Sequence, residues 1–210
     1  ALAAYMVSGD KGGVTVVTDS VTSDGLHEYL ENTLGDTHYR YRRGYKNVIN
    51  KAQELCQKGI DCPLAIETSG HAALRENYFL DDGAYLVTKI VIELARGKDI
   101  EEILKPLKAP AEEKECRFNI LCDDFKAYGN TVIDELTKYA ESRPDYKIAS
   151  DNREGVRIST ENGFFLLRLS VHDPVMPMNF ESNVKGGIKK DIDGIRGFFE
   201  RFKELDISSL

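Results

Sequence analysis

The residues best suited to binding chemistry lie in one short segment, Glu67-Thr68-Ser69-Gly70-His71. A carboxylate accepts hydrogen bonds from two neighbouring hydroxyls, a serine hydroxyl donates or accepts, and an imidazole does either according to its tautomer. Gly70 allows the backbone to bend toward a ligand, because glycine has no Cβ to restrict it. These residue types favour a polyol as the ligand, and an ordinary polar surface turn is the alternative of equal weight.

This polar segment follows Pro63-Leu64-Ala65-Ile66, a short apolar run that predicts a buried strand. Since α/β proteins place ligand groups where strands leave the sheet, the position agrees with a binding loop. Further along the chain, Asp81 and Asp82 precede Gly83. Two adjacent carboxylates supply the oxygen ligands that Mg²⁺ prefers, but at the start of a helix they more often cap the first turn. We favour the cap.

Basic and aromatic side chains are interleaved in a second segment, which contains Tyr39, Arg40, Tyr41, Arg42, Arg43, Tyr45 and Lys46. Alternation along a strand places His38, Arg40 and Arg42 on one side and the tyrosines on the other. Such a segment binds nucleic acid through stacking and charge, or a phosphate monoester through arginine forks. The formal net charge of −7 favours the phosphate monoester. A solvated basic edge strand is the third interpretation.

A third candidate segment runs from Arg168 to Pro174 and includes Ser170, His172 and Asp173. An arginine, a serine hydroxyl and free loop amides together are able to bind a phosphate. The succession of Ser170, His172 and Asp173 also resembles a hydrolytic triad. We reject the triad because near neighbours in an extended loop point in different directions, whereas the members of a working triad converge from separate segments.

Composition limits the class of protein. The chain has 210 residues, enough for one large or two medium domains at about 100–200 residues each. Its 41% hydrophobic and 30% charged residues are typical of a globular protein. The acidic balance argues against a general binder of nucleic acid or anionic membranes, and no apolar run approaches the length of about 20 residues that a membrane helix needs. We therefore expect a cytoplasmic protein with no nucleic-acid or membrane partner.

Cysteines are sparse, and they form two pairs: Cys56 with Cys62, and Cys116 with Cys122. Five residues separate the members of each pair, which is longer than the usual zinc spacer of about two to four residues. We therefore expect no metal site in this chain.

Two close prolines, Pro106 and Pro110, disfavour any regular element and suggest a division of the chain. We expect a first domain over 1–105, a linker over 106–115 and a second domain over 116–210. The first domain has predicted strands at 14–18, 37–43 and 63–66, and predicted helices at 26–34, 45–58 and 81–95. The second has predicted strands at 117–122, 154–159, 164–169 and from 179, and predicted helices at 128–141 and 188–205. This order predicts an α/β domain with a mixed sheet, followed by a smaller α+β domain with an antiparallel sheet and two helices.

Two local features complete the expectations for the fold. The helix expected over 81–95 is strongly apolar, and helical spacing predicts this inward-facing set: Ala84, Val87, Ile90, Val91 and Leu94. The first residues, 1–7, lack an initiator methionine and resemble the last turns of a helix. We therefore expect the chain to begin within a domain.

The motifs, taken in order, resemble the alpha-D-phosphohexomutases, the superfamily of phosphoglucomutase and phosphomannomutase. The similar segments are Thr18–Ser23, Arg42–Lys46, Glu67–His71 and Glu76–Gly83 for the family's third domain, and Glu154–Val156 with the loop at Arg168 for its fourth. The resemblance covers nearly the whole chain and is most specific at Glu67–His71 and Asp81–Gly83. It implies an isomerase of carbohydrate metabolism that moves a phosphate between the 1- and 6-positions of a hexose through a bisphosphorylated sugar.

The resemblance also implies roles for individual residues. Glu67 and Ser69 would bind sugar hydroxyls, and His71 would support the sugar or its phosphate. Arg42 or Arg43 would line the substrate cleft. In the second domain, Arg168 and Ser170 would hold the phosphate that is not being transferred. The family's phosphate loop usually reads Arg-x-Ser-Gly-Thr-Glu-Pro, and this chain departs from it at three positions: Val171, His172 and Asp173.

The family's phosphoserine nucleophile and its Mg²⁺ loop belong to its first and second domains, and Asp10-Lys11-Gly12-Gly13 is not a metal loop. The resemblance therefore implies a carboxy-terminal half that lacks a catalytic residue and is inactive alone. Mg²⁺ and a hexose 1,6-bisphosphate activator would act in the full-length enzyme. The partners would be a hexose phosphate and the missing N-terminal domains. A non-catalytic sugar-phosphate-binding or assembly module is the alternative.

Overall fold

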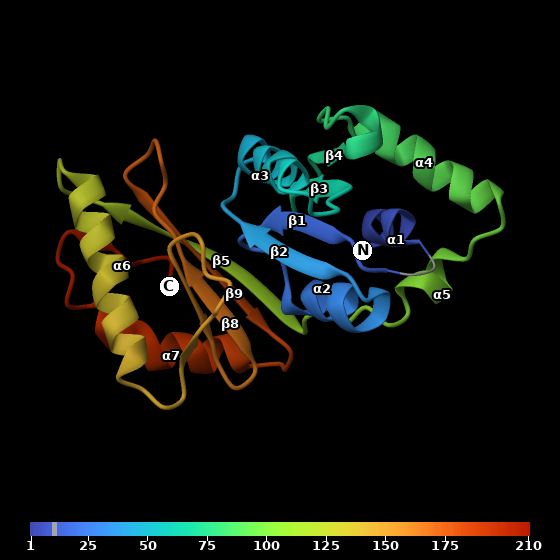
Figure 1. Ribbon diagram of the computed structural model, residues 1–210. Helices are drawn as coiled ribbons and strands as arrows, with labels where there is room; N and C mark the ends of the chain where they lie inside the picture. Colours follow the sequence, from blue (N-terminus) through green and yellow to red (C-terminus); the bar gives the residue numbers. More distant parts are fainter. Residues whose placement is uncertain (10–11) are drawn as a thin grey trace. The chain divides into compact units, whose positions relative to one another are not determined.

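Two sheets of different kinds organise the chain (Figure 1). The computed structural model describes residues 1–9 and 12–210, so the segment Asp10-Lys11 of the expected non-metal loop lies outside the described residues. The chain divides into two compact units, Ala1–Ala109 and Pro110–Leu210. Strand β5 (Glu112–Ile120) already occupies the end of the stretch 106–115 in which we expected a linker. Each unit is described by itself below.

The first unit contains a mixed sheet of four strands in the order β2-β1-β3-β4. The strands are β1 (Thr15–Asp19), β2 (Thr37–Tyr41), β3 (Leu64–Ile66) and β4 (Ala72–Leu74). β1 pairs in parallel with both β2 and β3, whereas β4 returns antiparallel to β3. All five residues of β1 are buried, as expected for a central strand covered on both faces. The predicted mixed α/β sheet is confirmed.

Helices cover both faces of this sheet. They are α1 (Leu2–Ser8), α2 (Asp24–Glu28) with a π-helical continuation η1 (Tyr29–Leu34), α3 (Tyr45–Gln57), a 3₁₀ turn η2 (Arg75–Asn77), α4 (Gly83–Ala95) and α5 (Ile100–Leu104). Val16 and Leu64 face one core cluster with residues of α1 and α4. Their strand neighbours Val17 and Ala65 face the opposite cluster, against α3. The period of two in the strands thus sends alternate side chains to the two layers.

Helix α4 buries a different face from the one its spacing predicted. Leu86 is its one buried residue, whereas Val87, Val91 and Leu94 are 59%, 56% and 44% exposed. Ala84 is exposed too, so the predicted inward set was wrong for four residues, and of that set Ile90 packs against the core. The two charged residues of the helix, Lys89 and Glu93, lie one turn apart on its less exposed side, so charge does not mark the face that points to solvent. No helix in the described part of the chain is long and apolar enough to span a membrane.

Two alanine substitutions test this assignment of the α4 faces. Leu86→Ala should lower the free energy of unfolding of the first unit by about 2–4 kcal/mol, because it removes buried methyl groups and leaves a cavity. Val91→Ala should change it by less than about 0.5 kcal/mol, because the side chain is exposed and alanine favours the helix. Urea unfolding of both variants measures the difference, and a cost for Val91→Ala that equals the cost for Leu86→Ala would contradict the assignment.

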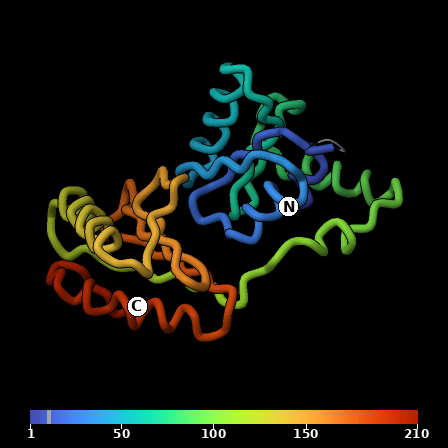
Figure 2. Tube along the Cα trace, turned by 60° about the horizontal axis from the view of Figure 1, so that its bottom comes forward, coloured from blue at the N-terminus to red at the C-terminus, as the bar shows by residue number. Residues whose placement is uncertain are grey.

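The second unit is an antiparallel sheet of six strands in the order β10-β5-β9-β8-β7-β6. Besides β5, its elements are α6 (Phe125–Glu141), β6 (Lys147–Ile148), β7 (Val156–Ser159), β8 (Gly163–Leu167), β9 (Val175–Ser182), α7 (Gly187–Phe199) and β10 (Leu205–Asp206). Figure 2 shows α6 and α7, the yellow-green and red helices, beside these strands. The antiparallel sheet with two helices confirms the predicted fold of this part.

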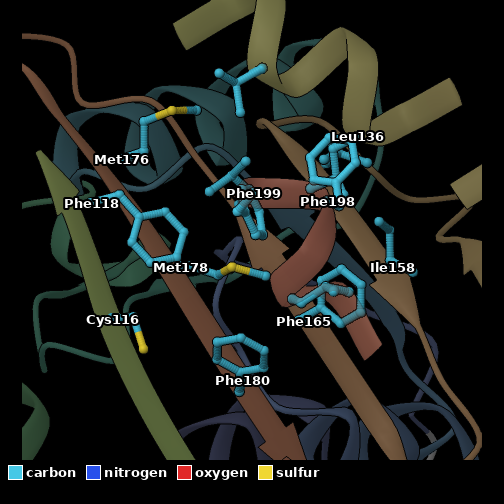
Figure 3. Close-up of a cluster of buried hydrophobic side chains, with 14 of the residues drawn as sticks. Cys116, Phe118, Leu136, Ile158, Phe165, Met176, Met178, Phe180, Phe198 and Phe199 are labelled. Carbon is cyan, nitrogen blue, oxygen red and sulfur yellow. The ribbon is translucent and has the colours of Figure 1, made fainter. Parts of the chain in front are cut away.

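One core lies between this sheet and its two helices. Phe118, Phe165 and Phe180 point from three different strands toward Leu136 of α6 and Phe199 of α7 (Figure 3). The remaining buried members include Cys116, Met176 and Met178. Alternate residues of each strand therefore face the helices, which leaves the intervening side chains, among them Asn179, on the opposite face of the sheet.

Two elements of the second unit differ in extent from the prediction. β9 begins at Val175, whereas Pro174 and Pro177 had hidden its first half, because proline is unusual inside a central strand. The helix predicted over 188–205 ends at Phe199, after which Leu205 pairs with Ile120 in the sheet. Phe202 continues the helical spacing by packing on the same core from the turn.

Candidate functional site

The segment Glu67–His71 forms the loop of the hairpin between β3 and β4. The backbone N–H of Glu67 donates to the carbonyl of His71 at 2.9 Å, and the N–H of Gly70 donates to the carbonyl of Glu67 at 3.0 Å. Gly70 has φ +94°, a backbone conformation that side chains with a Cβ rarely adopt. The loop therefore has a closed, defined shape at the end of β3.

Asp19 fixes this loop through hydrogen bonds, and it was not among the predicted site residues. It ends β1, is completely buried, and its Oδ2 accepts from the backbone N–H of Thr68 at 3.1 Å and from Thr68 Oγ1 at 2.7 Å. Its Oδ1 accepts from Thr22 Oγ1 at 3.1 Å. An aspartate that ends a β-branched strand, directly followed by hydroxyl residues, is the signal that would have suggested an anchoring role.

Glu67 is also buried, and its carboxylate is fixed by the neighbouring helix. Oε1 accepts from the backbone N–H of Gly44, the residue before α3, at 2.6 Å, and Ser69 Oγ donates to Oε2 at 3.4 Å. A helix N-terminus attracts a negative charge, so α3 helps to hold this carboxylate in place. A carboxylate has about four acceptor positions, and these two contacts leave room for donors from a ligand.

His71 stands at the exposed end of the loop. Its Nδ1 lies 2.7 Å from Asp81 Oδ2, and its ring stacks on Tyr45, with centroids 5.1 Å apart and an interplanar angle of 27°. Asp81 Oδ1 also accepts from the backbone N–H of Ala72 at 3.3 Å. Because an acceptor-only carboxylate faces Nδ1, the proton belongs on that nitrogen, and Nε2 is left to accept from a ligand or, when protonated, to donate to it.

This arrangement predicts the tautomer of His71. At a pH where the ring is neutral, the Nδ1–H form should dominate in the unaltered chain, and Asp81→Leu should raise the share of the Nε2–H form, because the Nδ1 proton loses its acceptor. Nitrogen chemical shifts of the imidazole measure the two forms directly. Asp82→Leu is the matched control, since Asp82 does not contact His71, and an unchanged tautomer ratio in Asp81→Leu would refute the assignment.

The basic segment follows its predicted alternation only as far as Tyr41, where β2 ends. His38 and Arg40 share one buried side, whereas Arg42, which was predicted on that side, is exposed. Arg40 is buried and donates to the carbonyls of Thr22 and Ser23, both at 3.1 Å, and it pairs with Asp24 at 2.8 Å. It therefore closes the start of α2 and does not face a ligand. His38, on the same side of β2, is buried as well. Its Nε2 lies 2.7 Å from Thr18 Oγ1, and its Nδ1 lies 3.0 Å from Nδ1 of His27.

Arg42 and Arg43 follow β2 and directly precede Gly44, whose N–H binds Glu67. Arg42 is exposed and Arg43 is half-buried, with its carbonyl accepting from Asn47 Nδ2 at 2.7 Å. The structure thus brings the end of the basic segment and the loop Glu67–His71 to the same edge of the first sheet.

The two adjacent aspartates do not form a cation site. Asp82 caps α4, because its Oδ1 accepts from the N–H of Tyr85 at 2.9 Å, and Asp81 is engaged by His71. Over residues 1–9 and 12–210, no three His, Cys, Asp or Glu side chains gather as a metal ligand set. The residues present therefore do not fit a Mg²⁺ site, and we assign no Mg²⁺-dependent step to them.

The third candidate segment, Arg168–Pro174, lies in the second unit, directly after β8. Arg168 is buried, its Nη2 donates to Asn179 Oδ1 at 3.3 Å, and its backbone N–H donates to the carbonyl of Pro177 at 3.0 Å. Ser170 Oγ accepts from the N–H of Asp173 at 3.2 Å. The rejected triad finds no support, since this turn contact occupies the serine and both His172 and Asp173 are exposed.

The chain thus combines a mixed α/β unit, which carries the polar hairpin loop, with an antiparallel α+β unit. A family model described as "Phosphoglucomutase/phosphomannomutase, alpha/beta/alpha domain III" matches residues 1–109. The chain belongs to the phosphoglucomutase/phosphomannomutase family, a family of isomerases. The resemblance inferred from the motifs is confirmed.

Two curated relatives are phosphoglucomutases. The protein from Neisseria meningitidis is 30% identical over 128 residues, which is 60% of this chain and 27% of that protein. The protein from Neisseria gonorrhoeae is 27% identical over the same shares of both chains. The chain thus matches only about a quarter of the length of these relatives.

Solved structures show the same fold over nearly the whole chain. A phosphoglucomutase/phosphomannomutase family protein from Burkholderia thailandensis has a TM-score of 0.74 at 23% identity, over 95% of this chain and 40% of that one. Aspergillus fumigatus N-acetylphosphoglucosamine mutase, in complex with GlcNAc-6P and magnesium, has a TM-score of 0.56 at 11% identity, over 93% and 45%. At these identities the likeness establishes the fold alone.

Proposed function

We propose that this chain is the substrate-recognition half of a phosphohexomutase that interconverts hexose 1-phosphate and hexose 6-phosphate through a bisphosphate intermediate. The observation that carries the proposal is the anchored loop Glu67–His71, in which buried Asp19 fixes the backbone and Gly44 fixes the carboxylate. Family membership supports the same reaction class.

In the first unit, Glu67 and Ser69 bind the sugar. Vicinal hydroxyls donate to the carboxylate, and the serine hydroxyl donates to or accepts from a third group on the ring. Because Gly44 already holds one oxygen of Glu67, the carboxylate loses little freedom when the sugar binds. His71, oriented by Asp81, presents Nε2 to the sugar or its phosphate, and Arg42 or Arg43 supplies positive charge at the same edge.

In the second unit, Arg168 and Ser170 hold the phosphate that is not transferred. A guanidinium fork matches two phosphate oxygens, and the serine hydroxyl adds one hydrogen bond. Asn179 supports Arg168 from the next strand and is itself bonded to Glu115 at 3.0 Å, which keeps the guanidinium in a defined orientation. Val171, His172 and Asp173 replace the family's usual residues in this loop, so its backbone contributes less to the proposed binding.

Transfer of a phosphate also requires a nucleophile and charge neutralisation at the moving group. We propose that the phosphoserine, Mg²⁺ and the hexose 1,6-bisphosphate activator act in further domains of the same protein, which would be its principal partner. The exposed apolar residues Val87, Val91 and Leu94 of α4 support this, since exposed apolar side chains that share one side of a helix are often covered by a partner. Four free thiols support a cytoplasmic location, because thiols stay reduced there.

Calorimetric titration with three ligands tests the proposed recognition role. Glucose 1,6-bisphosphate should bind with a dissociation constant of about 1 mM or lower, because both a hydroxyl-binding and a phosphate-binding segment contribute. Glucose and inorganic phosphate should each bind at least about 10-fold more weakly, since each engages one segment only. Equal affinity for all three, or no binding of the bisphosphate at millimolar concentration, would contradict the proposal.

The chain alone should show no mutase turnover. In a coupled assay with glucose 1-phosphate, glucose 1,6-bisphosphate and Mg²⁺, the rate of glucose 6-phosphate formation should equal that of the buffer blank, because no phosphoserine is present. A full-length family member serves as the positive control. Turnover above the blank that scales with the amount of chain would refute the division of labour proposed above.

A further inference from the structure

Two cysteines meet at the base of the hairpin whose tip is the candidate sugar loop. Cys56 lies near the end of α3 and Cys62 lies just before β3, and Cys56 Sγ donates to the backbone carbonyl of Cys62 at 3.2 Å. Directly beyond, the N–H of Arg75 donates to the carbonyl of Pro63 at 2.9 Å, which closes the hairpin. The sulfur of Cys56 thus already contacts the backbone of the second cysteine.

The two thiols differ in exposure but share one core. Cys62 is fully buried in the cluster beneath α3, and Cys56 packs against that cluster while remaining half-buried. Between them, residues 58–61 are exposed and belong to no helix or strand. A disulfide requires Cα atoms within about 7 Å and correctly directed Cβ atoms. Here the Cys56 sulfur lies 3.2 Å from the backbone oxygen of Cys62, so the two residues are direct neighbours in space.

The two thiols differ in access to an oxidant. Arg75 pairs with Asp61, the residue before Cys62, at 2.7 Å, and this contact raises the pKa of Arg75. Cys62 is fully buried, and burial raises the pKa of its thiol to about 12. Cys56 is half-buried, so a soluble hydroperoxide reaches its sulfur first.

We propose that Cys56 and Cys62 form a redox modification site, in which a hydroperoxide oxidises Cys56 and Cys62 then closes a disulfide. The Cys56 thiolate attacks one peroxide oxygen, the O–O bond breaks, and Cys56 becomes a sulfenic acid as hydroxide or alkoxide leaves. The Cys62 sulfur then attacks the Cys56 sulfur, the S–S bond forms and the S–O bond breaks. The departing hydroxyl takes the Cys62 proton and leaves as water. The peroxide gains the two electrons that the two thiols lose.

The bond would tie the end of α3 to the strand that carries Glu67. Bond closure takes rotation of the Cys62 side chain, whose thiol now donates to the Leu64 carbonyl at 3.9 Å. None of Cys56, Cys62 and Arg75 is among the proposed ligand-binding residues. The redox site therefore stands or fails independently of the proposed function.

Peptide mapping of the folded chain tests the proposal. The chain is treated with hydrogen peroxide, free thiols are blocked with N-ethylmaleimide, and the unreduced protein is digested and analysed by mass spectrometry. We expect one peptide pair joined through Cys56 and Cys62, and no pair joined through Cys116 and Cys122, which have the same spacing in the sequence. Equal yields of the two bonds, or no Cys56–Cys62 bond, would overturn it.

Two variants separate the steps. Cys62→Ala should accumulate a sulfenic acid at Cys56 that dimedone traps, and Cys56→Ser should abolish both the trap product and the disulfide. Since Cys62 is buried and its replacement costs stability, the map of the unaltered chain remains the deciding measurement.

Discussion

Replacing Arg168 by methionine should weaken the binding of glucose 1,6-bisphosphate by about 10- to 100-fold. Methionine retains an apolar stem but removes the guanidinium that we propose as the principal phosphate ligand of the second unit. Charge-assisted hydrogen bonds contribute about 1.5–3 kcal/mol each, and a guanidinium makes two of them to one phosphate. Calorimetric titration of the variant against the unaltered chain measures the loss.

Arg117→Met is the matched control for this substitution. Arg117 belongs to the same unit and is a largely exposed arginine that bonds Glu115 through Nε at 2.8 Å. Its replacement removes the same charge from the second unit, while Asn179, which Glu115 also bonds, is left in place beside Arg168. Affinity should stay within about 2-fold of the unaltered chain. An equal loss of affinity in both variants would show that Arg168 acts only through the net charge of the unit. No loss of affinity in Arg168→Met would exclude Arg168 as a phosphate ligand.

The substitution Asp19→Ala should lower the free energy of unfolding of the first unit by about 3 kcal/mol. Asp19 is fully buried, and its removal leaves the Thr68 N–H, the Thr68 hydroxyl and the Thr22 hydroxyl without their acceptor. Buried donors that lose their partner cost about 1–3 kcal/mol each, although relaxation of the loop toward water recovers part of that. The same relaxation should release the loop Glu67–His71.

Amide hydrogen exchange measures this effect residue by residue, which suits a chain of two units that need not unfold together. In Asp19→Ala, exchange at Thr68 should accelerate by about 100-fold, and bisphosphate binding should weaken with it. Asp124→Ala is the control, because Asp124 caps α6 of the second unit and should cost about 1 kcal/mol without affecting Thr68. Unchanged protection of Thr68 in Asp19→Ala would show that Asp19 does not anchor the loop.

Much of the fold was predictable because its elements carry local patterns. The β-branched run that became β1 and the alternation in β2 predicted strands, and their order predicted a mixed sheet. Two features were not predictable in the same way. The buried face of α4 is chosen by tertiary packing around Leu86, and it is the side that carries Lys89 and Glu93 rather than the more apolar side. The start of β9 was hidden by Pro177, which sits in a central strand against the usual preference.

The candidate site was predictable only where its residues are adjacent in sequence. Glu67, Ser69 and His71 share one loop, so their chemistry was apparent from residue types alone. Their supports come from elsewhere: Asp19 lies 49 positions from Thr68, and Gly44 lies 23 positions from Glu67. No local pattern reports such pairs. For Arg40, the alternation of the strand predicted which side of β2 the residue is on. It did not predict that this side is buried beside α2.

The most direct test of the account is a nuclear magnetic resonance titration. Glucose 1,6-bisphosphate is added, up to millimolar concentration, to the isotope-labelled chain while the backbone amide signals are followed. We expect saturable shifts at Glu67–His71 and at Arg168–Ser170, because the ligand offers sugar hydroxyls to the first segment and a phosphate to the second. The shifts at Glu67–His71 should vanish in Glu67→Ala. Titration without perturbation at either segment, or with perturbation confined to other parts of the chain, would contradict the assignment of this chain as the sugar-phosphate recognition half of a mutase.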